Sequence, residues 1–145
     1  MRKILSSIIA FYLLSSPIYA DNVISFNDAY MILMPTKSGG VFGELVNHTN
    51  EHIRIISAES PNAKKVELHN HVKDGDMMKM MPIDDIIIPA NGRKMLKRGG
   101  IHIMVMGVDK ELSYDETIEI TLMLDNGRYL TQDIILKPLR FLKNK

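Results

Sequence analysis

Residues 117–136 read TIEITLMLDNGRYLTQDIIL, and this segment decides the fold class. Apolar and polar residues alternate on both sides of Asn126-Gly127, as they do in strands with one buried face. Asn and Gly both tolerate the positive φ that a two-residue hairpin turn requires. The segment therefore predicts a β-hairpin with strands at Thr117–Leu124 and Tyr129–Leu136.

The same pattern extends back to Val23. Short apolar or alternating runs are separated by turn residues, and no long stretch has a helical period. Turns are expected at Ser38-Gly39-Gly40, Asp74-Gly75 and Gly99-Gly100, and Lys137–Lys145 is expected to be a basic tail. This spacing of short strands predicts an all-β fold, an antiparallel β-sandwich. Further strands are predicted at Val23–Met34, Val41–Asn47, His52–Ala58, Lys65–His71, Asp76–Met81, Ile86–Ile88, Arg93–Leu96 and Ile101–Met106.

The first twenty residues have the layout of a secretory signal peptide. Arg2 and Lys3 form a basic head, and the apolar run Ile4–Leu14 that follows is too short to span a bilayer. Ala20 supplies the small residue at the expected cleavage position. We therefore predict a signal peptide at 1–20 and one β-sandwich domain at 21–145, located in the periplasm with no stable membrane anchor after cleavage.

Charge and cysteine content exclude several function classes. Without the signal peptide, the chain has 16 basic and 17 acidic residues, and so lacks the excess of positive charge that is typical of nucleic-acid-binding proteins. The sequence has no cysteine, so a thiolate metal site, a cysteine nucleophile and a lipid-bearing cysteine are all excluded. Zincin, nucleophile-elbow and phosphate-loop motifs are also missing, and we expect no enzymatic activity.

Four residues with soft or borderline neutral donors form the candidate functional site. His69 and Met80 are separated by ten residues, and His102 and Met104 by one, with twenty-one between the two pairs. Side chains at i and i+2 of a strand point to the same face, so His102 and Met104 are expected to converge. Two imidazoles and two thioethers suit Cu(I) better than zinc, magnesium or calcium, and thioethers cannot form disulfides in an oxidising compartment.

Three nearby residues are candidates for further ligands. His71 shares a strand face with His69 and is expected to be a solvated strand-end histidine, with an outer or alternate ligand as the other reading. Met106 is expected to serve packing. Met78, two residues before Met80 on the same face, remains an open competitor of Met80.

The spacing of His69, Met80, His102 and Met104 resembles the signature of the PCu(A)C periplasmic copper chaperones. Further landmarks that look like this family include Val66-Glu67-Leu68-His69, Asp74-Gly75 and Gly99-Gly100-Ile101-His102-Ile103-Met104. The resemblance implies a cupredoxin-like β-sandwich that binds Cu(I) outside the cytoplasm. It also implies a role in supplying the copper centres of cytochrome c oxidase. The tail lacks the histidine- and methionine-rich extension that some members use for Cu(II).

The leading hypothesis is a periplasmic Cu(I) chaperone that passes its ion to cytochrome c oxidase or another copper assembly factor. Neutral imidazole is the ligand form, so binding is expected to weaken below about pH 6. Two alternatives remain open: a copper-independent β-sandwich that binds protein partners, and a periplasmic copper-buffering protein.

Overall fold

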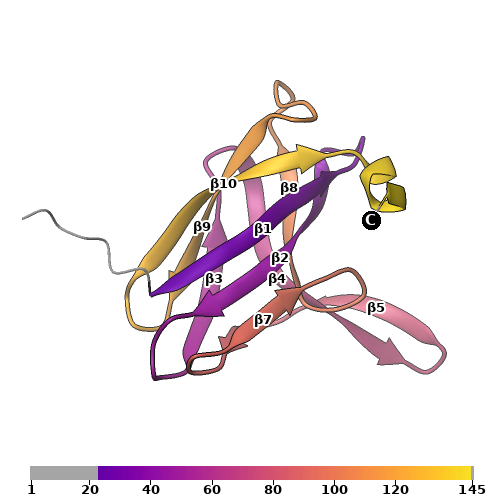
Figure 1. The fold of residues 1–145 in the computed structure, drawn as a ribbon. Coiled ribbons are helices and arrows are strands. Elements are labelled where there is room, and N and C mark those ends of the chain that lie inside the picture. Colours follow the sequence, from indigo (N-terminus) through magenta and orange to yellow (C-terminus); the bar gives the residue numbers. More distant parts are fainter. Residues whose placement is uncertain (1–22, 145) are drawn as a thin grey trace, which may run out of the picture.

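The computed structural model describes residues 23–144, and it contains ten β-strands and one short 3-10 helix (Figure 1). Each strand predicted from the sequence is present, with bounds that differ by a few residues. The predicted signal peptide lies outside the described residues. The elements are β1 Ile24–Leu33, β2 Ser38–Asn47, β3 Ile53–Glu59, β4 Ala63–Asp74, β5 Met77–Pro82, β6 Ile86–Ile88, β7 Arg93–Leu96, β8 His102–Val108, β9 Thr117–Leu124, β10 Tyr129–Lys137 and the 3-10 helix η1 Leu139–Asn144.

The strands form one hydrogen-bonded path in the order β5-β4-β8-β2-β1-β10-β9-β3-β6, and β7 pairs with β2. Neighbouring strands are antiparallel except β1 and β10, which run parallel with Tyr30 opposite Ile135. The sheet curls into a cupredoxin-like β-sandwich, which confirms the predicted fold class. Within residues 23–144, no helix has the length and apolar character that a membrane span needs.

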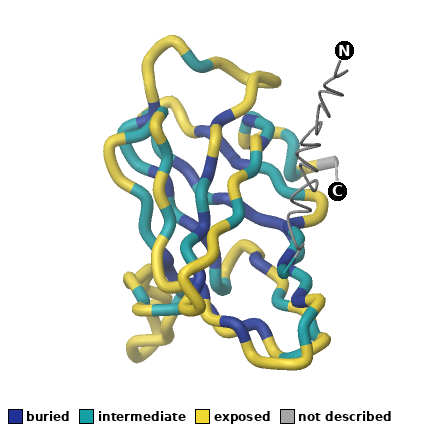
Figure 2. The backbone as a smooth tube through the Cα atoms, turned by 90° about the vertical axis from the view of Figure 1, so that its left-hand side faces the viewer, coloured by how far each residue is buried: buried dark blue, intermediate teal, exposed yellow. Residues whose placement is uncertain are grey.

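The core holds the alternate apolar residues of the strands. Ile103 and Val105 of β8 are fully buried in it, and Leu68 of β4 packs with them. Buried and exposed positions alternate along much of the chain, and the loops are mostly exposed (Figure 2). Because successive side chains of a strand point to opposite faces, His102, Met104 and His69 lie on the other face of the same strands. The core thus fixes the backbone on which the candidate ligands stand.

The prediction of a turn at Ser38-Gly39-Gly40 was wrong. These residues belong to β2, and the reversal lies just before them at residues 35–37. A Cβ atom on Gly39 would lie 1.8 Å from the carbonyl oxygen of Ile32. Gly39 therefore serves the close approach of β2 to β1 rather than a turn.

Within the predicted basic tail, Leu139–Asn144 form η1, which packs back onto the sandwich. The ring of Phe141 meets Tyr30 edge to face at a centroid distance of 5.3 Å, and Tyr30 in turn lies 5.7 Å from Phe42. The cation of Lys137 lies 5.5 Å from the Phe141 ring centroid. These aromatic contacts hold η1 near the face that carries the candidate ligands.

Candidate metal site

Three adjacent strands bring the four predicted residues to one region of the sandwich. The hairpin β4–β5 extends beyond its body (Figure 1), and β8 lies on the other side of β4. His69 of β4 is the register partner of His102 of β8, and His71 is the partner of Met80 on β5. Met104 lies opposite Glu67 on β4 and Gly40 on β2. The predicted turn at Asp74-Gly75 is present, with Gly75 at φ 62°, and it reverses the chain for this pairing.

His102 is 2% exposed, and the structure determines which of its ring nitrogens is free. Its Nδ1 lies 2.9 Å from the carbonyl oxygen of Gly100. Because a carbonyl only accepts, Nδ1 donates, and the lone pair of the neutral ring sits on Nε2. Burial lowers the pKa of His102, and the hydrogen bond to Gly100 opposes this shift only in part. The nearby His71 and His69 lower the pKa slightly further. The ring is therefore neutral at pH 7.

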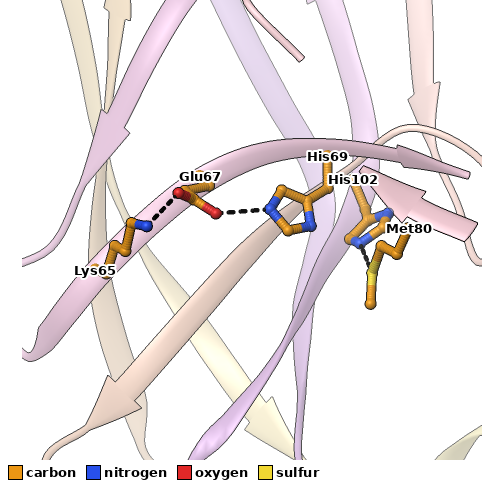
Figure 3. A network of polar contacts seen from close by, with 5 residues as sticks. All are labelled: Lys65, Glu67, His69, Met80 and His102. Carbon is orange, nitrogen blue, oxygen red and sulfur yellow. Dashed lines mark hydrogen bonds and ion pairs between the residues drawn. The ribbon is translucent and has the colours of Figure 1, made fainter. Parts of the chain in front are cut away.

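The free Nε2 of His102 lies 3.0 Å from the Sδ of Met80 (Figure 3). A thioether sulfur carries no proton, so an imidazole nitrogen lone pair and a sulfur lone pair face each other. Two electron-pair donors at this distance repel unless an acceptor of electron pairs lies between or beside them. The pair is therefore suited to a soft cation, and a small local adjustment would open the donors around it.

His69 is 8% exposed and is held from one side by Glu67. Its Nε2 lies 2.8 Å from Oε2 of Glu67, whose Oε1 is 2.5 Å from the Nζ of Lys65. Lys65 first, and His69 second, lower the pKa of Glu67, which is a carboxylate at neutral pH. The other ring nitrogen of His69, Nδ1, is buried with no hydrogen-bond partner among residues 23–144. The His69 and His102 ring centroids are 5.9 Å apart.

An apolar cavity of about 490 Å³ opens beside the His102–Met80 pair. Met80, His102 and Met104 line it, whereas His69 does not and sits on the inner side of the group. Its other walls come from β1, β2, β4, the turn before β8 and η1, through Ile32, Met34, Gly40, Phe42, His71, Arg98, Gly99, Leu139 and Leu142. Three of the four predicted residues therefore share one cavity, and the fourth adjoins it.

The structure also places the three candidates for further ligands. His71 lines the cavity, with its ring centroid 5.3 Å from that of His102, so it lies closer to the site than a solvated strand-end residue would. Met78 lies opposite Lys73, farther out on the hairpin, and is exposed. Met80 is thus placed better than Met78. Met106 pairs with Lys65 and does not line the cavity.

Several contributors were not recognised in the sequence. Glu67 could have been found, because it precedes His69 by two residues on the same strand face. The Gly100 carbonyl, Phe42 and η1 could not, because their roles depend on tertiary placement. Within the described part of the chain, no three His, Asp or Glu side chains cluster as a metal site of such ligands requires.

Comparison with known proteins places this geometry in a family. The family model described as "Putative lipoprotein LpqE-like" matches residues 24–135. A putative lipoprotein of Leifsonia xyli subsp. xyli is 31% identical over 87 residues, which cover 59% of this chain and 52% of that protein. The match thus spans about half the length of that relative. The 145 residues of the present chain include no cysteine to carry a lipid.

Solved structures show the same architecture. The copper-bound PCuAC domain from PmoF2 is 20% identical, with 83% of this chain and 97% of that chain covered and a TM-score of 0.65. The solution structure of Cu(I)-DR1885 from Deinococcus radiodurans is 31% identical, with 77% and 76% covered and a TM-score of 0.59. Sequence match and structural likeness agree, and the chain belongs to the LpqE-like family of PCuAC-type domains.

Proposed function

We propose that this protein is a Cu(I) carrier that binds one ion through His69, Met80, His102 and Met104. The observation that carries the proposal is the 3.0 Å approach of His102 Nε2 to Met80 Sδ, two lone-pair donors with no proton between them. The buried, unpartnered Nδ1 of His69 supplies a further donor next to them. Met104, which lines the same cavity as Met80 and His102, supplies the second thioether.

The donor set favours Cu(I) over other ions. Thioethers are soft ligands that bind zinc, calcium and magnesium poorly, and neutral imidazole completes a site without negative charge. Because no thiolate is present, the ion is held by bonds that a stronger acceptor can replace. Met80 is 46% exposed, which leaves one ligand reachable by an incoming partner. These properties support a carrier rather than an enzyme or a permanent copper centre.

We further propose that the carrier works outside the cytoplasm, in the periplasm. The signal-peptide pattern of residues 1–20 and the lipoprotein description of the family support this location. The copper-bound state of two relatives with this fold supports the cargo. Cytochrome c oxidase, or another copper assembly factor, is the proposed recipient. Copper transfer to an apoprotein acceptor distinguishes a carrier from a buffering protein. A carrier should pass its ion to the acceptor faster than free dissociation allows, whereas a buffering protein should not.

Competition with a coloured Cu(I) chelator tests the metal site, and the chain offers a matched pair of variants. Met80 and Met81 are neighbours on β5 with 46% and 49% exposure, but Met80 faces His102. Met80→Leu is expected to weaken Cu(I) binding at least about tenfold, equivalent to about 1.4 kcal/mol. Met81→Leu should leave it unchanged. The proposal fails if the wild-type chain does not bind one Cu(I), or if both variants bind as it does.

A further inference from the structure

Lys65, Glu67 and His69 form a polar row along one face of β4. Their spacing at i, i+2 and i+4 places all three side chains on that face. Glu67 accepts a hydrogen bond from His69 Nε2 at 2.8 Å, and its second oxygen is paired with Lys65 (Figure 3). The Glu67 side chain is 25% exposed and that of His69 is 11% exposed. The row thus leads from solvent into the candidate metal site.

The contact with Glu67 determines which His69 nitrogen carries the proton. A carboxylate only accepts hydrogen bonds, so Nε2 is the donor and holds the hydrogen. In the neutral ring, Nδ1 is then left with the lone pair. Figure 3 shows this second nitrogen on the side of the ring that faces His102 and Met80.

The burial of that lone pair without a partner indicates a missing ligand. His69 is 8% exposed as a whole residue, and its Nδ1 has no hydrogen-bond partner within residues 23–144. Leaving a buried acceptor unpaired is unfavourable, because it has lost its hydrogen bonds to water without gaining a partner. A metal ion next to Nδ1 would satisfy it, and the Glu67 contact would make the ring a better electron donor.

His102 has the opposite arrangement. Its Nδ1 donates to the Gly100 carbonyl at 2.9 Å, and its Nε2 is free toward Met80. The two rings are therefore held in different tautomers by different acceptors, a carboxylate and a backbone carbonyl. This asymmetry leaves different ring nitrogens without a proton on two residues that lie opposite each other on β4 and β8.

We propose that Glu67 is a positioning residue that holds His69 as the Nε2–H tautomer, so that Cu(I) binds Nδ1 of His69 and Nε2 of His102. This inference rests on the proposed function for its copper part, whereas the tautomer part concerns the metal-free protein. Glu67 does not touch the ion. It acts through the orientation and proton of His69, as carboxylates behind histidine ligands do.

Long-range proton–nitrogen spectra of ¹⁵N-histidine-labelled protein test the inference in two states. Without metal at pH 7.5, His69 should show the Nε2–H pattern and His102 the Nδ1–H pattern. With one Cu(I) added, the metal-induced shift should appear on Nδ1 of His69 and on Nε2 of His102. A copper-bound Nε2 of His69, or an Nδ1–H tautomer in the metal-free protein, overturns the inference.

Variants separate positioning from general stability. Glu67→Ala is expected to lower Cu(I) affinity about 10–100-fold and to broaden or mix the His69 tautomers. Glu67→Gln keeps an acceptor oxygen and should restore a single tautomer and most of the affinity. Glu119→Ala, which removes an exposed glutamate from β9, is the control and should change neither. Equal affinities of the wild type and Glu67→Ala overturn the role of Glu67.

The two proposals fail in different ways. If the wild-type chain does not bind Cu(I), the proposed function fails, and the metal-free spectrum still decides whether Glu67 sets the tautomer. If Cu(I) binds but His69 uses Nε2, the carrier function stands and the positioning role of Glu67 is refuted.

Discussion

Replacing His69 by leucine is expected to make the metal-free fold more stable while abolishing a ligand. The substitution keeps a side chain of similar size at a site that is 8% exposed. It removes the unpartnered Nδ1, whose burial costs about 1–3 kcal/mol. A protein that keeps such an atom in place of an apolar side chain gives up stability for binding.

The magnitude follows from two opposing changes. The variant loses the His69–Glu67 hydrogen bond, worth about 1 kcal/mol here because Glu67 stays partly hydrated and paired with Lys65. Relief of the buried acceptor and the added apolar burial exceed this loss. The free energy of unfolding should therefore rise by about 1 kcal/mol, equivalent to about 3 °C in Tm for a domain of this size.

Urea unfolding of the metal-free wild type, His69→Leu and Leu68→Ala measures these differences. Leu68 is the adjacent residue on the core face of β4, and its truncation should cost about 2–5 kcal/mol. With excess Cu(I), only the wild type of the first two should gain stability through ligand binding. A metal-free His69→Leu variant that is less stable than the wild type by more than about 2 kcal/mol would refute the reasoning.

Three other predictions concern stability. Asn47→Ala should lower the free energy of unfolding by about 3 kcal/mol. The two N–H groups of the buried amide are shared among three carbonyl oxygens that lie 2.7–3.2 Å from Nδ2, and its oxygen accepts two hydrogen bonds from Thr49. Asn47→Asp, which keeps only the acceptor, should also be destabilised in urea unfolding. Gly39→Ala should lower the free energy of unfolding by several kcal/mol or prevent folding, since a Cβ there would lie 1.8 Å from the Ile32 carbonyl oxygen. A near-native thermal melt of this variant, followed by circular dichroism, would contradict this. Burial lowers the pKa of His102 in the folded state below its unfolded value of about 6.5. The stability that comes from burying the neutral ring is therefore fully present above about pH 6.5 and is lost as the pH falls through the folded pKa. The wild type should lose more stability than His102→Gln between pH 7.5 and 5, and parallel stability profiles of the two proteins would contradict the lowered pKa.

Most of the fold could be predicted from strand periodicity and turn chemistry. The hairpin around Asn126-Gly127 and the reversal at Asp74-Gly75 follow from local preferences, and the structure has both. The parallel pairing of β1 with β10 could not be predicted, because it joins residues more than a hundred positions apart and has no local signature. Gly39 was misassigned because a glycine needed for close strand approach looks the same in sequence as a turn glycine.

The candidate site was predictable where strand geometry alone decides. His102 and Met104 follow the two-residue period, and the topology β5-β4-β8 brings His69 and Met80 to them. The choice of Met80 over Met78 needed the register, which puts Met80 opposite His71 and against His102. The cavity walls from Phe42 and η1 depend on long-range packing, and no spacing rule reveals them.

X-ray absorption at the copper edge of the Cu(I)-loaded protein tests the central claim most directly. The wild type should show a Cu(I) edge with two sulfur and two nitrogen neighbours for each copper. Met80→Leu should lose one sulfur neighbour, and Met81→Leu should give the wild-type spectrum. A copper ion surrounded by nitrogen and oxygen alone, or a spectrum that Met80→Leu leaves unchanged, would contradict the proposed site.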